Sequence, residues 1–255
     1  MDIPLLVAHR GYAARYPENT LPALEAAVKA GACYVEFDVQ MTVDHIPVLF
    51  HDDDLSRVAD NSARINETRA DELKKFSPCE TQRFGQTFSS VQIPALAEAA
   101  ILLKQYNRVT AFVELKETGL QTAGVQTMVD TVMQVLAAVK KQVVLISFRS
   151  DALVYARQKH HVPIGWVISQ FDDESKQVAD KLQPDYLFCN YKKLPRTERP
   201  MWPGQWQWCL YEVIDPELAL RLAQKGAHMI ETMNIGDMLR HPELCKRSCI
   251  EQDAL

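Results

Sequence analysis

The chain alternates short apolar segments with helical patterns along most of its 255 residues. Because neighbouring parallel strands need long crossover connections, usually helices, such alternation is typical of a parallel sheet. Eight segments have the length and apolar content of buried strands: Pro4–His9, Tyr34–Val39, Thr110–Lys116, Val143–Phe148, Ile164–Ile168, Tyr186–Cys189, Trp206–Val213 and His228–Thr232. Eight strands separated by helices predict an α/β fold, a (β/α)8 TIM barrel.

A doubly wound open sheet is the alternative, but no glycine-rich phosphate loop follows the first strand. The length suits one barrel, so we predict a single domain over residues 1–255. The least regular stretch, Asp52–Pro94, is polar and rich in turns. We expect it to form a short inserted segment, a loop or small subdomain, after the second strand.

The helical patterns carry recognisable start and stop signals. They cover Thr20–Ala30, Ala95–Tyr106, Gln121–Val139, Ser150–His160, Asp173–Leu182, Pro216–Lys225 and Asn234–Lys246. Asn19 is predicted to cap the first of them and Gly31 to end it. Pro216 stands in a first helical turn, and Gly226 lies just past the end of the same helix.

Composition excludes several classes of protein. The net charge of −5 gives no reason to expect nucleic acid as a partner. The longest apolar runs are too short to span a bilayer, so no membrane span is expected. The segment Met1–Pro4 lacks a basic start and a small-residue cleavage site, and we therefore expect no signal peptide.

The six cysteines show no spacing typical of a zinc site. Cys33 and Cys189 lie in or beside apolar strands, where reduced core thiols are common. Cys245 and Cys249 are four residues apart on a predicted helix, without partner ligands, and are interpreted as ordinary. These observations favour a cytoplasmic protein with free thiols.

Charged side chains cluster where the first three strands end. His9 and Arg10 end the first strand, Glu36 and Asp38 the second, and Glu114 and Lys116 the third. His51 follows a further short apolar segment, Ile46–Phe50, which predicts a hairpin-like excursion after the second strand. Active sites of barrels are built at the carboxyl ends of the strands. We therefore expect these side chains to converge on one mouth.

Glu36 and Asp38 are two residues apart, so on a strand they project from the same face. Val35, Phe37 and Val39 project from the other face. Two carboxylates side by side in an apolar strand are costly to bury unless a cation compensates them. The sequence therefore predicts a divalent metal ion at this position.

The motifs taken in order resemble those of the glycerophosphodiester phosphodiesterase family, bacterial and soluble type. They are His9-Arg10-Gly11, Pro17-Glu18-Asn19-Thr20, Glu36-Phe37-Asp38, His51-Asp52 and Glu114-Leu115-Lys116. The resemblance implies a barrel fold, which agrees with the strand count. It also implies metal-dependent hydrolysis of glycerophosphodiesters, the deacylated phospholipids, to sn-glycerol 3-phosphate and an alcohol.

By this resemblance, Glu36, Asp38 and Glu114 are the metal ligands. Oxygen-only ligation suits one Mg²⁺ or Ca²⁺ ion and argues against zinc. Arg10 and Lys116 would bind the phosphate of the small-molecule substrate, since a guanidinium offers a fork of donors.

His9 and His51 would then be the catalytic acid–base pair. Which histidine acts first stays open. So does the nucleophile, which is either water or a hydroxyl of the substrate's own glycerol.

The second half of the chain is less similar to the family. The segments Tyr211–Ile214 and His228–Met233 depart from its usual strand ends, so we expect them to set substrate specificity. One alternative is a lysophospholipase D-type enzyme acting on lysophospholipids. A less favoured one is a non-catalytic barrel that binds phosphodiesters. Barrel enzymes commonly form homodimers, but no interface can be identified in the sequence.

Overall fold

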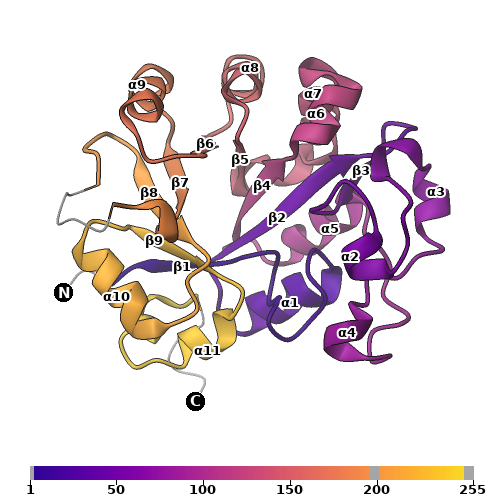
Figure 1. Ribbon diagram of the computed structural model, residues 1–255, viewed down its shortest axis with the longest axis horizontal. Coiled ribbons are helices and arrows are strands. Elements are labelled where there is room, and N and C mark those ends of the chain that lie inside the picture. The colour runs from indigo at the N-terminus through magenta and orange to yellow at the C-terminus, as the bar shows by residue number, and fades with distance from the viewer. Residues whose placement is uncertain (1–2, 196–200, 250–255) are drawn as a thin grey trace.

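The computed structural model describes residues 3–195 and 201–249, and its strands form one closed sheet surrounded by helices (Figure 1). The strands are β1 (Leu5–Ala8), β2 (Tyr34–Met41), β3 (Pro47–Leu49), β4 (Thr110–Leu115), β5 (Val143–Ser147), β6 (Ile164–Val167), β7 (Tyr186–Asn190), β8 (Gln207–Tyr211) and β9 (Met229–Thr232). The order is β1-β9-β8-β7-β6-β5-β4-β2, and pairing of β1 with β2 closes the barrel. These eight strands are parallel, which confirms the predicted (β/α)8 barrel.

The short strand β3 runs antiparallel to the end of β2, where Val39 pairs with Leu49. It is the predicted hairpin-like excursion, and it returns the chain to the barrel mouth just before His51. The parallel register between β2 and β4 pairs Asp38 directly with Glu114. Two carboxylates far apart in sequence thus become neighbours across two strands.

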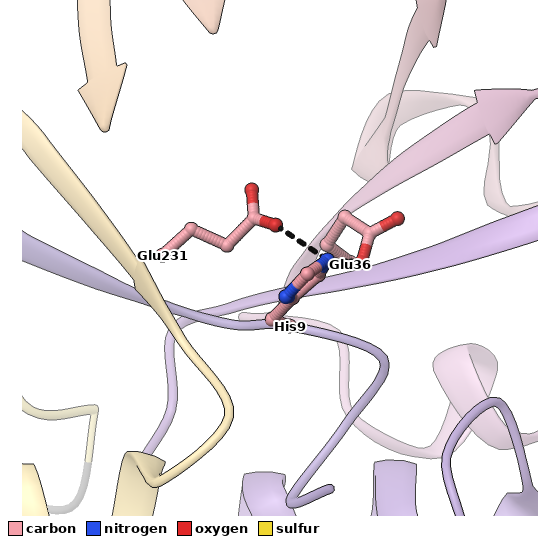
Figure 2. A group of neighbouring side chains, drawn as sticks. All are labelled: His9, Glu36 and Glu231. Atoms are coloured by element: carbon pink, nitrogen blue, oxygen red, sulfur yellow. Dashed lines mark ion pairs between the residues drawn. The ribbon is translucent and has the colours of Figure 1, made fainter. Parts of the chain in front are cut away.

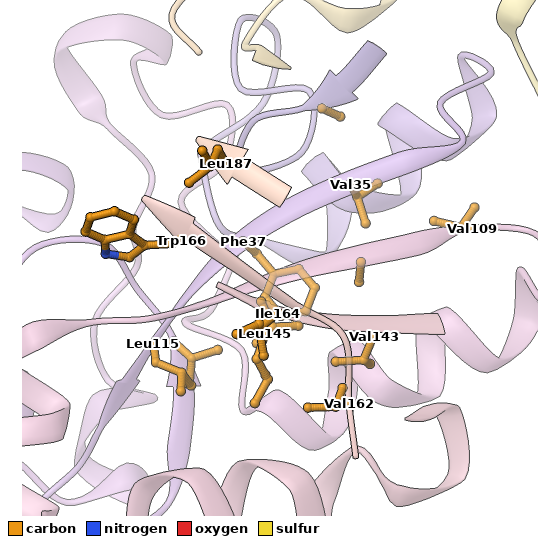
Figure 3. Close-up of a cluster of buried hydrophobic side chains, with 14 of the residues drawn as sticks. Val35, Phe37, Val109, Leu115, Val143, Leu145, Val162, Ile164, Trp166 and Leu187 are labelled. Carbon is orange, nitrogen blue, oxygen red and sulfur yellow. The ribbon is translucent and has the colours of Figure 1, made fainter. Parts of the chain in front are cut away.

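Alternation along the strands divides the core into two layers. The inner layer fills the barrel and consists of Val7, Phe112, Val144, Ile146, Val167, Phe188, Cys209 and Met229. The outer layer lies between strands and helices, and Figure 3 shows part of it, including Val35 and Phe37. Because Val35 and Phe37 face outward, Glu36 and Asp38 face the inside of the barrel.

The main surrounding helices are α1 (Leu21–Lys29), α5 (Leu96–Gln105), α6 (Glu117–Ala123), α7 (Val125–Val135), α8 (Ser150–His160), α9 (Asp173–Leu182), α10 (Pro216–Gln224) and α11 (Ile235–Leu239). The prediction of one helix over Gln121–Val139 is wrong. Gly124 has a positive φ of 79° and separates α6 from α7. The predicted helix Asn234–Lys246 also breaks, since α11 ends early and a 3-10 turn, η4 (Leu244–Arg247), follows Pro242.

The start of α1 also differs from prediction. Thr20, not Asn19, is the N-cap, and its side chain accepts a hydrogen bond from the Ala23 N–H. The stop signals Gly31 and Gly226 both have positive φ, as expected for residues that end a helix. Asn19 is thereby available for another role.

Residues 52–94 fold into short turns beside the barrel. They contain α2 (Ser56–Ala59), a 3-10 turn η1 (Ile65–Glu67), α3 (Ala70–Leu73) and α4 (Thr81–Phe84). A small apolar cluster holds them, formed by Val48, Phe50, Leu55, Val58, Ile65, Leu73 and Ile93. Since Val48 and Phe50 come from the β3 excursion, this cluster anchors the segment directly behind His51.

The expectation of free thiols is wrong for one pair of cysteines. Cys33 and Cys249 form a disulfide with a Cα–Cα distance of 5.1 Å, although 216 residues separate them. The Cys249 N–H also donates to the Gly31 carbonyl, which fixes the end of the described chain beside β2. Only the closed fold creates this proximity. Cys189 is a buried free thiol, as predicted. Since reducing compartments rarely retain disulfides, Cys33 no longer supports a cytoplasmic location.

A search of the described residues for a helix long and apolar enough to cross a membrane finds none.

Candidate active site

A pocket of about 210 Å³ opens at the carboxyl ends of the strands. Its lining is His9, Arg10, His51, Glu114, Lys116, Ile146, Phe148, Val167, Phe188, Tyr211, Glu212 and Glu231. Five of the seven predicted site residues belong to this lining. The other two, Glu36 and Asp38, are buried below it and contact its members.

His9 follows β1, is buried and lines the pocket. Figure 2 shows it between Glu231 and Glu36. Its Nε2 atom lies 3.1 Å from a carboxylate oxygen of Glu231 and 3.8 Å from one of Glu36. Burial removes the water that would solvate an imidazolium, and the charge of Arg10 adds to this effect. Together they lower the His9 pKa to about 3. The imidazole is therefore neutral in this arrangement.

Three carboxylates gather beside His9 at the ends of β2 and β4. Oxygens of Glu36, Asp38 and Glu114 lie within 4.8 Å of one another, close enough to bind one ion. One Glu36 oxygen, Oε1, is buried without a hydrogen-bond partner. Burial and the charges of Asp38 and Glu231 raise the Glu36 pKa well above its usual range. A divalent cation would bind the unpartnered oxygen and offset the repulsion between the carboxylates. Glu36, Asp38 and Glu114 therefore fit the expected metal.

Two cations face the same carboxylates. Arg10 places its Nε 3.2 Å from Asp38, and its backbone N–H donates to Glu36 over 3.0 Å. Lys116 lies 3.2 Å from Asp38 and 2.9 Å from Glu114. Burial opposes ionisation of Asp38, but Lys116 and Arg10 outweigh it and lower the pKa of that carboxyl. Asp38 is thus ionised and available as a ligand.

His51 follows β3 in the sequence and also lines the pocket. Its Nδ1 atom lies 2.6 Å from Asp52, and Asp52 in turn accepts from Arg57 Nε over 2.6 Å. A carboxylate at Nδ1 fixes the tautomer and the ring orientation of a histidine. His51 is partly exposed, in contrast to the buried His9.

Two residues of the Pro17–Thr20 motif organise the site, although the sequence reasoning gave neither a role there. Glu18 accepts from Arg10 over 2.7 Å and from Arg57 over 2.6 Å, so it links Arg10 to the residue that also binds Asp52. Asn19 donates to the Asp38 carboxylate over 2.8 Å and accepts from the Asp38 N–H over 3.0 Å. Their position within a quoted motif was the available signal.

Glu231, at the end of β9, is the third residue that the sequence reasoning missed. It is buried, and burial together with the charge of Glu114 raises its pKa well above its usual range. In the described part of the chain, no lysine or arginine side chain is ion-paired with Glu231 or Glu36. No sequence pattern indicates it, because Glu231 is a lone charged residue within a short, mostly apolar strand.

The chain matches the model of the glycerophosphoryl diester phosphodiesterase family over residues 9–229. Among curated relatives, mouse glycerophosphodiester phosphodiesterase 1 is 37% identical over 110 residues, which are 43% of this chain and 33% of the mouse protein. A Bacillus altitudinis glycerophosphodiester phosphodiesterase is 32% identical over 121 residues, covering 48% of this chain and 49% of that protein. The chain thus matches a third to a half of the length of these relatives.

Solved structures resemble the whole barrel. An Oleispira antarctica phosphodiesterase, in complex with the product sn-glycerol-3-phosphate, has a TM-score of 0.80 and 26% identity. The match covers 93% of this chain and 96% of that one. A glycerophosphodiester phosphodiesterase from Parabacteroides distasonis has a TM-score of 0.75 and 23% identity, over 96% of this chain and 98% of its own. At that identity the second match concerns the fold alone.

The Glu18 network predicts a pH-dependent contribution to stability. Burial opposes ionisation of Glu18, but hydrogen bonds from Arg57 and the charge of Arg10 outweigh it and lower its pKa below 4.5. A carboxyl with a lowered folded-state pKa stabilises the protein above its unfolded-state pKa, and this stability is lost as the pH falls. Glu18→Gln should therefore reduce the free energy of unfolding at pH 7 by about 1.5–3 kcal/mol.

The loss should shrink at an acidic pH below the lowered pKa of Glu18, where the carboxyl group of the wild type is protonated. Denaturant unfolding at both values measures it. Glu25→Gln on α1, a partly exposed control that is ion-paired with Lys29 one turn away, should change stability by less than about 0.5 kcal/mol. An equal loss for Glu18→Gln at both pH values would refute an electrostatic role.

Proposed function

Because this chain belongs to the glycerophosphoryl diester phosphodiesterase family, we propose that it hydrolyses glycerophosphodiesters to sn-glycerol 3-phosphate and an alcohol. The observation that carries the proposal is the convergence of two histidines, three carboxylates and two cations on one pocket. The product named for the Oleispira antarctica structure supports the same substrate class.

Glu36, Asp38 and Glu114 would hold one divalent cation, either Mg²⁺ or Ca²⁺. When bound, such an ion neutralises the charge of the phosphodiester and polarises its phosphorus–oxygen bonds. The buried, unpartnered oxygen of Glu36 and the oxygen-only donor set support this assignment. Asn19 donates a hydrogen bond to the Asp38 carboxylate, so Asp38 would already be oriented before an ion binds.

Arg10 and Lys116 would bind the non-bridging oxygens of the substrate phosphate. Both side chains line the pocket, and both are anchored by carboxylates, Arg10 by Glu18 and Lys116 by Glu114. An anchored guanidinium loses little conformational freedom when it binds an anion. Arg10 in a left-handed backbone conformation, with φ of 53°, also turns its own N–H toward Glu36.

His9 and His51 would perform the proton transfers, one accepting the proton of the nucleophile and the other protonating the leaving alkoxide. The two rings enter from different strands, β1 and β3, and both line the pocket. In-line displacement at phosphorus needs proton transfer on two opposite sides, so a pair of separated histidines suits it.

A second candidate substrate class, the lysophospholipids, has one observation in its favour. Phe148 and Ile214 follow β5 and β8 at the mouth side and expose 41% and 64% of their surface. The phenylalanines of the inserted segment do not add to them. Phe76 is partly buried against the apolar cluster of that segment, and Phe84 and Phe88 are partly buried and pack edge to face. Two separate apolar residues are common on any surface, so the deacylated substrates remain our proposal.

The proposal is tested by phosphomonoester release from a panel of glycerophosphodiesters that differ in head group, with a lysophospholipid as a further substrate. We expect sn-glycerol 3-phosphate from the deacylated diesters, loss of turnover in excess chelator, and recovery with Mg²⁺ or Ca²⁺. Phosphorus NMR of the products measures it. Full activity in excess chelator would refute the metal, and head-group release from the lysophospholipid alone would favour the second candidate.

Replacing either histidine should abolish one proton transfer. His9→Asn and His51→Asn should each lower turnover at least about a hundredfold, the low end for a positioned acid or base. The matched control is His45→Asn, in an exposed turn with a positive φ that asparagine tolerates. Steady-state rates and unfolding temperatures should be measured together. Near-normal turnover of a well-folded His51→Asn variant would overturn the two-histidine mechanism.

A further inference from the structure

His9 lies between two buried carboxyl groups, which come from the two strands on either side of β1. Figure 2 shows the ring of His9 with Glu231 on one side and Glu36 on the other. Glu231 belongs to β9 and Glu36 to β2, the two strands that pair with β1. Possible ligand atoms of the three side chains lie within 4.8 Å of one another.

The distances match a compact coordination sphere. Zinc bonds to imidazole nitrogen and carboxylate oxygen are about 2.0–2.2 Å long, so tetrahedral ligand atoms lie roughly 3.4 Å apart. The His9 Nε2 atom is 3.1 Å from the Glu231 oxygen and 3.8 Å from the Glu36 oxygen, values on either side of this spacing. A small cation could therefore be bound with little side-chain movement.

The carboxyl groups of Glu36 and Glu231 also lack a lysine or arginine side chain as an ion-pair partner among the described residues. Both glutamates are nine-tenths or more buried. His9 is the one side chain that approaches both of them within ion-pairing distance among the described residues. The imidazole nitrogen of His9 offers a ligand beside the two carboxyl groups, and a cation bound between them would complete the group.

Glu36 belongs to two groups of potential ligands. It joins Asp38 and Glu114 in one group, and His9 and Glu231 in the other. In Figure 2 one of its oxygens lies near His9 and the other points away from both partners. Its Oε1 oxygen is buried and lacks a hydrogen-bond partner. A carboxylate with this placement can bridge two adjacent ions.

We propose that His9, Glu36 and Glu231 form a second cation site that takes a borderline transition metal such as Zn²⁺ and inhibits hydrolysis when occupied. The inhibitory part of this inference rests on the proposed role of His9. A single lone pair on Nε2 either binds the metal or accepts a proton, and so occupation removes His9 from catalysis.

The two sites should select different metals. Imidazole nitrogen is a good ligand for Zn²⁺ and a poor one for Mg²⁺ and Ca²⁺, which prefer oxygen. The group of Glu36, Asp38 and Glu114 offers oxygen alone, whereas the His9 group offers nitrogen and oxygen. Saturating Mg²⁺ should therefore fill the first site and leave the second open to Zn²⁺.

The test is zinc binding to the Mg²⁺-saturated full chain, measured by equilibrium dialysis and elemental analysis. We expect about one Zn²⁺ per chain in the wild type. Glu231→Gln should weaken zinc binding at least about tenfold, and Mg²⁺ binding much less. Glu114→Gln should show the reverse pattern. Glu212→Gln, which removes a pocket carboxylate outside both groups, should bind both metals like the wild type.

Turnover is then measured on the same samples. Zinc should inhibit the wild type at concentrations that fill the site, and inhibition of Glu231→Gln should need at least about tenfold more zinc. Two results would overturn the second cation site. One is the absence of zinc binding to the Mg²⁺-saturated wild type, and the other is a zinc affinity of Glu231→Gln equal to that of the wild type, with an unchanged unfolding temperature. Zinc bound without inhibition would overturn its effect. Because binding is measured without substrate, an inactive protein that binds zinc would refute only the proposed function.

Discussion

The structure of the pocket depends on the burial of Glu36 and Asp38 on the inner face of β2. Alternation along this strand turns Val35 and Phe37 toward the helices, so both carboxylates must face the barrel interior. An isolated carboxylate in such a place is strongly unfavourable. The surrounding residues are arranged to compensate for that cost, which explains why so many charges meet at one end of an otherwise apolar barrel.

The two carboxylates are compensated to different degrees, and this difference indicates where an ion would bind. Asp38 has contacts with Arg10, Lys116 and Asn19, and its pKa is lowered. Glu36 retains an unpartnered oxygen, and its pKa is raised. Proteins rarely leave such a group without a partner unless a ligand or ion completes it. The same network that holds Asp38 ionised also anchors Arg10 beside the pocket, so the proposed metal binding and phosphate binding would depend on the same contacts.

The barrel and most of the site could be predicted from sequence because both depend on local patterns. Short apolar segments that alternate with helical patterns located the eight strands. The positions of His9, Glu36 and Glu114 at strand ends then predicted that they lie at one mouth of the barrel. Glu231 was missed, since a lone glutamate in an apolar strand shows its role only when β9 pairs with β1. The Cys33–Cys249 disulfide was missed for the same reason, because only the closed fold brings these cysteines together.

Glu36, Asp38 and Glu114 are proposed to form a cation site, and thermal unfolding in the presence of metal tests this most directly. An ion that binds only the folded state stabilises it by about 2.7 kcal/mol at a hundred times its Kd. The unfolding temperature of the wild type should therefore rise with Mg²⁺ or Ca²⁺ concentration, whereas that of Glu36→Gln should stay nearly constant. If the unfolding temperature of the wild type did not respond to either ion, the proposed cation site would be wrong.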